Sequence, residues 1–317
     1  MDVKAYIEIA RIDHWFKNIF MLPGIVLVMY FVHRMNVVDF SFDWVRIGLG
    51  VFATCLVASS NYVINEILDR EKDLHHPVKK TRPVPSGRVK LSYGYAEWIL
   101  LGVLGIGLGF WINTPFGLCA LLLWVMGCLY NIPPIRTKDL AYGDVVSESV
   151  NNPIRLALGW YATGFTAYNP PLSVLLAYWM FGAFLMAMKR FAEFRMIDDP
   201  KRAGEYRDSF RWYTEERLLE SIFFYAAMFG MLSGIFMTRY RVELILATPM
   251  VAFAMAYYMH LGFKPDSPVQ TPENLYREKK LIVIVILAFG MCTALLLFDI
   301  DFFTNLVEQK MKFPVGS

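Results

Sequence analysis

The stretch 61–87, NYVINEILDREKDLHHPVKKTRPVPSG, carries a ladder of polar side chains out of an apolar segment. Asn61, Asn65, Asp69 and Asp73 are spaced four residues apart, so on a helix they share one face over about three turns. The residues that precede the ladder are apolar enough to lie in a membrane. Carboxylates near hydrocarbon are costly, and the ladder therefore indicates a functional site.

The end of the ladder suits a metal ion and a phosphate. Asp69 and Asp73 lie one turn apart and can each give an oxygen to Mg²⁺, which takes the rest of its shell from water and substrate phosphates. Pro77 ends the helix, and Lys79 and Arg82 on the following loop can hold phosphate oxygens. The alternative is a helix end with a basic cytoplasmic loop, which explains the cations but not the Asn/Asp ladder.

The motif resembles the first aspartate-rich motif of the UbiA superfamily of intramembrane prenyltransferases. The resemblance rests on N-x3-D-x3-D at Asn65, Asp69 and Asp73, followed by Arg-Pro-x3-Gly at 82–87. In that family the motif binds Mg²⁺ and a diphosphate, which implies that Asp69 and Asp73 are metal ligands and that Asn65 belongs to the catalytic group. Many members carry Asn-Asp where this chain has Asn65 and Glu66, and the pattern leaves the role of Glu66 open.

Composition places the chain among polytopic membrane proteins. It is 56% hydrophobic and 16% aromatic, with a mean hydropathy of +0.40, which argues against a soluble globule. A net charge of only +3 gives no global basic field for nucleic acid. The four cysteines lie inside apolar runs and indicate buried structural thiols. The N-terminus lacks a signal-peptide pattern.

Hydropathy predicts nine transmembrane helices in an all-α bundle. The predicted spans are 18–34, 45–65, 92–112, 115–130, 144–165, 171–189, 217–238, 242–262 and 280–299. With the N-terminus inside, 24 of the 31 Lys and Arg residues fall on inner segments and 6 on outer ones. The asymmetry predicts a multi-pass protein of the cell (inner) membrane, with a cytoplasmic N-terminus and the C-terminus outside.

No linker or composition shift suggests a second domain, so residues 1–317 are expected to form one transmembrane domain. An amphipathic lead-in at about 1–17 precedes the first span. The loops expected to form a cytoplasmic active site are 66–91, 131–143 and 189–217.

A proline-broken turn follows the fourth span. Two prolines force an extended conformation and present Arg136 and Lys138 near the membrane face, beyond Tyr130. A basic helix-end anchor is the alternative. Proteins of the UbiA type carry a similar Tyr-x2-Pro-hydrophobic-Lys/Arg turn, and that resemblance favours substrate contact.

The fifth span has a polar face at helical spacing. An arginine as deep as Arg155 is expected to face a water-filled cavity or an anion, with Glu148 as a candidate partner. A purely structural buried pair is the alternative. The residues of this face are Asp144, Glu148, Asn151, Asn152 and Arg155.

The sixth span ends in a mainly cationic turn. Most UbiA-type enzymes carry a second Asp-rich motif here, whereas this chain has Lys189, Arg190, Glu193 and Arg195. The pair at 198–199, Asp-Asp, has the wrong spacing for D-x3-D. Either these cations mark the cytoplasmic end of a transmembrane helix, or they hold a second anionic substrate without a second metal.

A closer resemblance is to decaprenyl-phosphate phosphoribosyltransferases, the UbiA branch that works in arabinan precursor synthesis. It covers roughly residues 10–300 and rests on the turn at 189–195, Tyr206-Arg207, the run 147–155 and the lead-in at 15–18, which contains Lys17. It implies a bundle around a central polar cavity and Mg-dependent transfer of 5-phosphoribose from 5-phosphoribosyl 1-diphosphate to a polyprenyl phosphate in the lipid bilayer.

In this interpretation Lys17, Lys189 and Arg190 position the lipid phosphate, which is already anionic and needs no strong general base. Two alternatives remain. One is a conventional UbiA-type prenyltransferase that moves a prenyl group from its diphosphate to an aromatic or other acceptor. The other is a transporter whose intramembrane charges line a pathway; the single ladder and the lack of a persuasive inverted repeat argue against it. Oligomeric state is not predicted.

Overall fold

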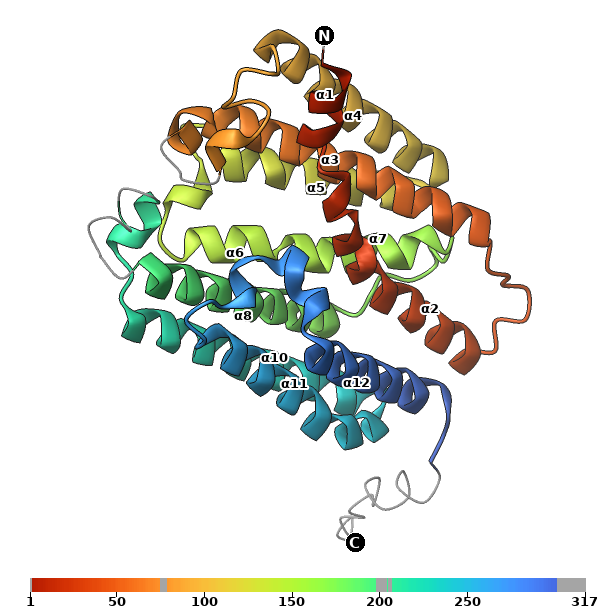
Figure 1. Ribbon diagram of the computed structural model, residues 1–317. Coiled ribbons are helices and arrows are strands. Elements are labelled where there is room, and N and C mark those ends of the chain that lie inside the picture. Colours follow the sequence, from red (N-terminus) through yellow and green to blue (C-terminus); the bar gives the residue numbers. More distant parts are fainter. Residues whose placement is uncertain (1, 75–78, 198–203, 205–206, 301–317) are drawn as a thin grey trace, which may run out of the picture.

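A computed structural model describes residues 2–74, 79–197, 204 and 207–300. Within these ranges the chain is helical and contains no strand (Figure 1), which confirms the predicted all-α fold. The acidic pair at 198–199, the tyrosine at 206 and the C-terminal end, all named by the sequence predictions, lie outside the described residues.

The elements succeed one another with short connections. They are α1 (Val3–Ile9), η1 (Ile12–Met21), α2 (Leu22–Arg34), α3 (Trp44–Leu74), η2 (Lys79–Thr81), α4 (Leu91–Ile112), α5 (Thr114–Asn131), η3 (Thr137–Asp139), α6 (Gly143–Ser149), α7 (Asn151–Ala162), α8 (Leu172–Ile197), η4 (Asp208–Arg211), α10 (Glu215–Tyr240), η5 (Val242–Ala247), α11 (Thr248–Gly262), η6 (Pro268–Gln270), η7 (Pro272–Arg277) and α12 (Lys279–Leu297).

Eight helical segments in the described part of the chain are long and apolar enough to cross a membrane. The fifth predicted span is built differently, from α6 and α7 end to end in the middle layer of the bundle (Figure 1). Pro153 has no N–H, and a proline ring clashes with the carbonyl four residues earlier, here Ser149. The helix is therefore interrupted at Val150, and the two halves together make the ninth segment.

Close backbone contacts fix α7 in the bundle. A Cβ added at Gly159 would lie 1.9 Å from the Met21 carbonyl oxygen, and one at Gly24 would lie 2.0 Å from the Leu156 carbonyl oxygen. Only glycine fits at such distances, because any side chain would force the backbones apart. This packing sets α7 against η1 and α2, and it determines which lead-in residues meet the polar face of the fifth span.

Two helices extend beyond the predicted membrane spans, and α3 does so as the helical ladder up to Asp73 predicted. α3 continues to Leu74 and α8 continues to Ile197. The first parts of the segments 66–91 and 189–217 are therefore helical, and they carry the aspartates of the ladder and the cationic turn. A rigid helix holds a functional side chain more closely than a loop does.

Candidate active site

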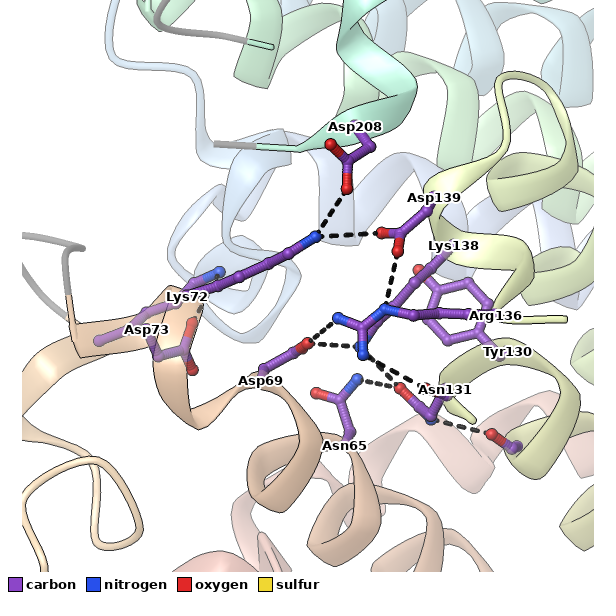
Figure 2. A network of polar contacts seen from close by, with 12 residues as sticks. Asn65, Asp69, Lys72, Asp73, Tyr130, Asn131, Arg136, Lys138, Asp139 and Asp208 are labelled. Carbon is purple, nitrogen blue, oxygen red and sulfur yellow. Dashed lines mark hydrogen bonds and ion pairs between the residues drawn. The ribbon is translucent and has the colours of Figure 1, made fainter. Parts of the chain in front are cut away.

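The two aspartates of the ladder each bind cations from later segments (Figure 2). Asp69 Oδ1 accepts from Arg136 Nη2 at 2.8 Å and from Lys138 Nζ at 2.6 Å. Asp73 Oδ2 accepts from Arg82 Nη1 at 2.7 Å, and Lys79 Nζ lies 3.9 Å from its Oδ1. Four cations from later segments thus contact these two carboxylates.

The turn after α5 brings two of these cations to Asp69. Arg136 adopts a left-handed backbone (φ 28°) and its Nε also donates to Asp139 Oδ2 at 2.8 Å. Lys138 is 5% exposed and donates to Asn131 Oδ1 at 3.0 Å, which also accepts from Asn65 Nδ2 at 2.5 Å. Asn131 therefore joins the ladder to the turn. Hereafter this group is the Asp69 cluster: Asn65, Asp69, Asp73, Lys79, Arg82, Asn131, Arg136 and Lys138.

Burial lowers the pKa of Lys138 to about 8, although the neighbouring Asp69 carboxylate opposes this change. The ammonium is therefore held away from water among other charges, where Coulombic interactions with an anion are stronger than at an open surface.

The role of Glu66 becomes clear from its single partner. Its side chain is 2% exposed and Oε1 accepts from the backbone N–H of Val84 at 3.1 Å. This contact ties the loop after η2 to α3, and the loop carries Arg82. Glu66 therefore fixes the position from which Arg82 reaches Asp73, and its neighbour Asn65 faces the turn after α5 instead.

The donor set fits Mg²⁺. Asp69 Oδ1 accepts the hydrogen bonds from both Arg136 and Lys138, and within the described ranges Oδ2 has no hydrogen-bond partner. Asp73 Oδ2 accepts from Arg82, and the contact that the described residues make with Oδ1 is Lys79 Nζ at 3.9 Å. Each carboxylate thus keeps one oxygen for a hard cation. The described residues contain no group of three His, Cys, Asp or Glu that could hold a metal, but Mg²⁺ needs only one or two carboxylates when substrate phosphates complete its shell.

A second group is centred on the fully buried carboxylate of Asp144. Its Oδ2 accepts from Arg190 Nε at 2.8 Å and from Ser209 Oγ at 3.3 Å, and its Oδ1 accepts from Tyr213 Oη at 2.6 Å. Arg207 Nη1 lies 3.6 Å from the same Oδ2. Desolvation raises the pKa of Tyr213, and the adjacent Asp144 raises it further, so Tyr213 is a hydrogen-bond donor.

Arg190 completes this group on α8. Its Nη1 donates to Glu193 Oε2 at 2.7 Å, and Lys189 Nζ lies 3.9 Å from Glu193 Oε1. Arg190 Nη2 donates to Tyr130 Oη at 3.4 Å, and Tyr130 comes from the end of α5, one residue before Asn131 of the first cluster. The two groups are therefore adjacent. The second is called the Arg190 cluster: Tyr130, Asp144, Lys189, Arg190, Glu193, Arg207, Ser209 and Tyr213.

The lead-in supplies a third set of contacts. Arg155 Nε donates to Asn18 Oδ1 at 3.1 Å, and Asn18 Nδ2 donates to Cys55 Sγ at 3.1 Å. Lys17 Nζ lies 5.6 Å from the centre of the Tyr62 ring on α3. Within the described ranges no hydrogen bond or ion pair joins Arg155 to Glu148. The partner suggested from sequence is thus replaced by Asn18, because the interruption at Val150 separates the two halves of the fifth span.

Three predicted substrate-binding residues lie in helix contacts. Asn61 Nδ2 donates to the Leu123 carbonyl oxygen at 2.9 Å, and its side chain packs on Gly127 of α5. Asn152 packs on Gly182 of α8. Arg195 lies away from Arg190: its Nε is 3.4 Å from Glu215 Oε1, and its guanidinium covers the rings of Phe191 and Phe263.

Several site residues were absent from the sequence prediction. Asp144 was on the predicted polar face of the fifth span, and Arg207 was part of the Tyr-Arg pair that carried the resemblance, so each had a sequence signal. The others had none, since they act through contacts between distant segments. They are Lys72, Asn131, Asp139, Asp208, Ser209 and Tyr213.

Comparison with known proteins identifies the family. Residues 26–277 match the UbiA prenyltransferase family, and the chain belongs to it. A UbiA homolog from Archaeoglobus fulgidus, described as bound to GPP and Mg2+, has the same fold: the TM-score is 0.67 at 17% identity, over 91% of this chain and 99% of that chain.

Several relatives are named decaprenyl-phosphate phosphoribosyltransferase. The protein of Corynebacterium glutamicum is 24% identical over 309 residues, 94% of this chain and 88% of the relative. The protein of Mycolicibacterium smegmatis is 26% identical over 217 residues, 68% of this chain and 64% of the relative. An uncharacterized protein of Sinorhizobium fredii, 26% identical over 168 residues and 53% of this chain, is matched over only 30% of its own length.

Proposed function

We propose that this protein transfers 5-phosphoribose from 5-phosphoribosyl 1-diphosphate to a polyprenyl phosphate and releases diphosphate. The observation that carries the proposal is the adjacency of two cation-rich groups, the Asp69 cluster and the Arg190 cluster, joined through Tyr130. Prenyl transfer to a neutral aromatic acceptor involves one anionic substrate, whereas this reaction brings a diphosphate, a ribose phosphate and a lipid phosphate together. The relatives of the same name at 24–26% identity support the assignment.

The donor diphosphate is assigned to the Asp69 cluster. When bound there, Mg²⁺ neutralises charge on the departing diphosphate. Arg82 and Lys79 approach Asp73 from the loop, and Arg136 and Lys138 approach Asp69 from the turn after α5. These four side chains are placed to take over phosphate oxygens when a substrate competes for them.

The reaction is a displacement at the ribose anomeric carbon. The bond from that carbon to the diphosphate oxygen breaks, and a bond forms from the carbon to an oxygen of the lipid phosphate. Positive charge develops at the sugar carbon, as in other glycosyl transfers. The nucleophile is anionic at neutral pH, so no side chain has to remove a proton; Lys17, Lys189 and the Arg190 cluster hold it in place.

The decisive experiment mixes purified protein, Mg²⁺, labelled 5-phosphoribosyl 1-diphosphate and polyprenyl phosphates of several chain lengths. We expect label in the organic-extractable lipid. In a parallel reaction, a prenyl diphosphate with an aromatic acceptor should not be consumed. If the ribosyl label stays in the aqueous phase while the prenyl diphosphate is used, the protein is a conventional prenyltransferase of the same family.

We further propose that the end of the bundle bearing the Asp69 cluster faces the cytoplasm. The excess of Lys and Arg on that side supports this orientation. In a cysteine-free background, Ser86→Cys should react with an impermeant reagent only from the cytoplasmic side, and Val38→Cys, in the exposed α2–α3 connection, only from outside. The opposite pattern would reverse the orientation.

A further inference from the structure

Arg207 belongs to the Arg190 cluster and also acts on residues of the Asp69 cluster. It comes from the segment after α8, and its guanidinium stacks on Phe210 at 5.9 Å from the ring centre. It interacts electrostatically with Asp69 and Lys138 of the first cluster and with Tyr130 and Glu193 of the second. A charge at this point acts on a ligand in either cluster.

The Arg207 side chain has hydrogen-bonding capacity to spare. Its Nη1 is buried and, in the part of the chain that the structure describes, has no hydrogen-bond partner. The 3.6 Å separation from Asp144 Oδ2 is an ion pair but too long for a hydrogen bond. Arg190 differs, because its Nε, Nη1 and Nη2 all donate to side chains of this protein.

A buried guanidinium nitrogen without an acceptor is costly unless a ligand supplies one. The Arg207 side chain is still 19% exposed, so a ligand can reach it. Phosphate oxygens are the acceptors that a planar guanidinium fork matches best. The excess of cations on both sides of Arg207 favours the same class of ligand.

Asp144 holds the segment that carries Arg207. It accepts hydrogen bonds from Ser209 and Tyr213, which follow Arg207 by two and six residues. Tyr213 Oη in turn accepts from the backbone N–H of Tyr142 at 2.7 Å, next to the start of α6. One buried carboxylate thus fastens the segment 207–213 to α6 and to Arg190 on α8.

We propose that Arg207 binds a phosphate monoester group of a substrate, and that Asp144 is the positioning residue that holds Arg207 for this purpose. The identity of the ligand rests on the function proposed above, which offers two such groups: the phosphate of the polyprenyl lipid and the 5-phosphate of the ribosyl donor. Both are monoesters, and the same guanidinium contact serves either one.

The test measures ligand-induced thermal stabilisation of the full-length protein in detergent. The probes are polyprenyl phosphate, 5-phosphoribosyl 1-diphosphate with Mg²⁺, and a prenyl diphosphate with Mg²⁺. Arg207→Gln should weaken binding of polyprenyl phosphate or of 5-phosphoribosyl 1-diphosphate about tenfold or more, the range for a hydrogen bond to a charged group, and leave binding of the prenyl diphosphate unchanged. The probe that weakens identifies the source of the phosphate. Arg207→Lys, which keeps the charge, should recover part of the affinity.

Arg217→Gln is the matched control, because Arg217 is an exposed arginine at the same end of the bundle whose Nη1 donates to the Trp212 carbonyl oxygen. It should bind all three probes like the wild type. If loss of the ion pair between Arg207 and Asp144 unfolds the protein, the double variant Asp144→Asn/Arg207→Gln removes both charges. Unchanged binding of every probe by a folded Arg207 variant would overturn the proposal.

These outcomes separate this inference from the proposed function. If the prenyl diphosphate alone stabilises the wild-type protein, ribosyl transfer is refuted. The effect of Arg207→Gln on binding of that probe can still be measured. The positioning role has its own signature. Asp144→Asn leaves both arginines charged but releases the segment that carries Arg207, so it should weaken binding of the same probe that Arg207→Gln weakens. Unchanged binding of every probe together with lower thermal stability would instead make Asp144 a plain structural anchor.

Discussion

Buried arginines occur at both ends of this bundle, but their surroundings differ. At the end remote from the Asp69 cluster, Arg241 donates Nε to the Leu295 carbonyl at 2.7 Å and Nη2 to the Phe298 carbonyl at 2.5 Å. Its Nη1 is bonded to Asp299 and lies 3.2 Å from Glu243. Every nitrogen of this guanidinium is used by the protein itself.

The charge balance separates the two groups as well. Arg241 and Arg34 face Glu243 and Asp299, so the cations equal the carboxylates. In the Arg190 cluster, Lys189, Arg190 and Arg207 outnumber the two carboxylates. A balanced, fully bonded group fastens helices together, whereas an excess of cations with an unused donor is a place for an anion.

The largest effect is expected at the Asp69 cluster. Asp69→Asn and Asp73→Asn each remove one carboxylate that the metal requires, so transfer activity should fall about 10²–10³-fold, the loss typical of removing a charge-stabilising group. Activity is measured with saturating Mg²⁺ on purified, folded protein. The control is Asp39→Asn, an exposed aspartate in the α2–α3 connection. Near-normal activity of both variants would contradict the assignment of Asp69 and Asp73 as metal ligands.

Breaking the Arg241 group should cost stability but not activity. Arg241→Met removes the cation that lies 3.2 Å from the buried Glu243, and the loss of one member of a buried pair costs about 3–5 kcal/mol. Thermal unfolding in detergent reports the loss, and turnover per folded molecule should stay normal. Arg239→Met, an exposed arginine two residues earlier, should change stability by less than about 0.5 kcal/mol. Lower turnover per folded molecule in Arg241→Met would contradict a purely structural role for the Arg241 group.

Arg155 tests whether the lead-in belongs to the active end. Its hydrogen-bond partner among the described residues is the neutral Asn18, so that contact does not balance the charge of Arg155. Arg155→Met should reduce kcat/KM about tenfold with a smaller relative change in thermal stability. Asn18→Leu removes the same hydrogen bond and leaves the cation. Equal losses of activity in the two variants would indicate a structural contact only.

The smallest effect is expected at the exposed bridge from Lys72 to Asp139 and Asp208 (Figure 2). The hydrogen bond from Lys72 lowers the pKa of Asp208. Its stabilising contribution is therefore present above the ordinary aspartate pKa and is lost as pH falls through the lowered value. Lys72→Gln should cost less than about 1 kcal/mol, with the difference from wild type vanishing in acid. A loss of several kcal/mol at neutral pH would make the bridge a structural element.

The sequence alone determined the parts of this protein that depend on local pattern. Runs of apolar residues placed the spanning helices to within a few residues, because a helix needs a set length to cross hydrocarbon. Four-residue spacing put Asn65, Asp69 and Asp73 on one helix face, since that periodicity belongs to the helix itself. Pro153 can be read from the sequence as a residue that breaks a helix, and the structure has an interruption at Val150.

Only the tertiary structure decided which side chains meet. No local pattern could show that Lys138 reaches Asp69 from 69 residues away, that Asn18 rather than Glu148 meets Arg155, or that Arg195 lies apart from Arg190. Such pairings depend on how helices pack, and here backbone contacts at Gly24 and Gly159 set that packing. Asp144 could be seen on a polar face, but its control of the Arg207 segment required the bundle to be assembled.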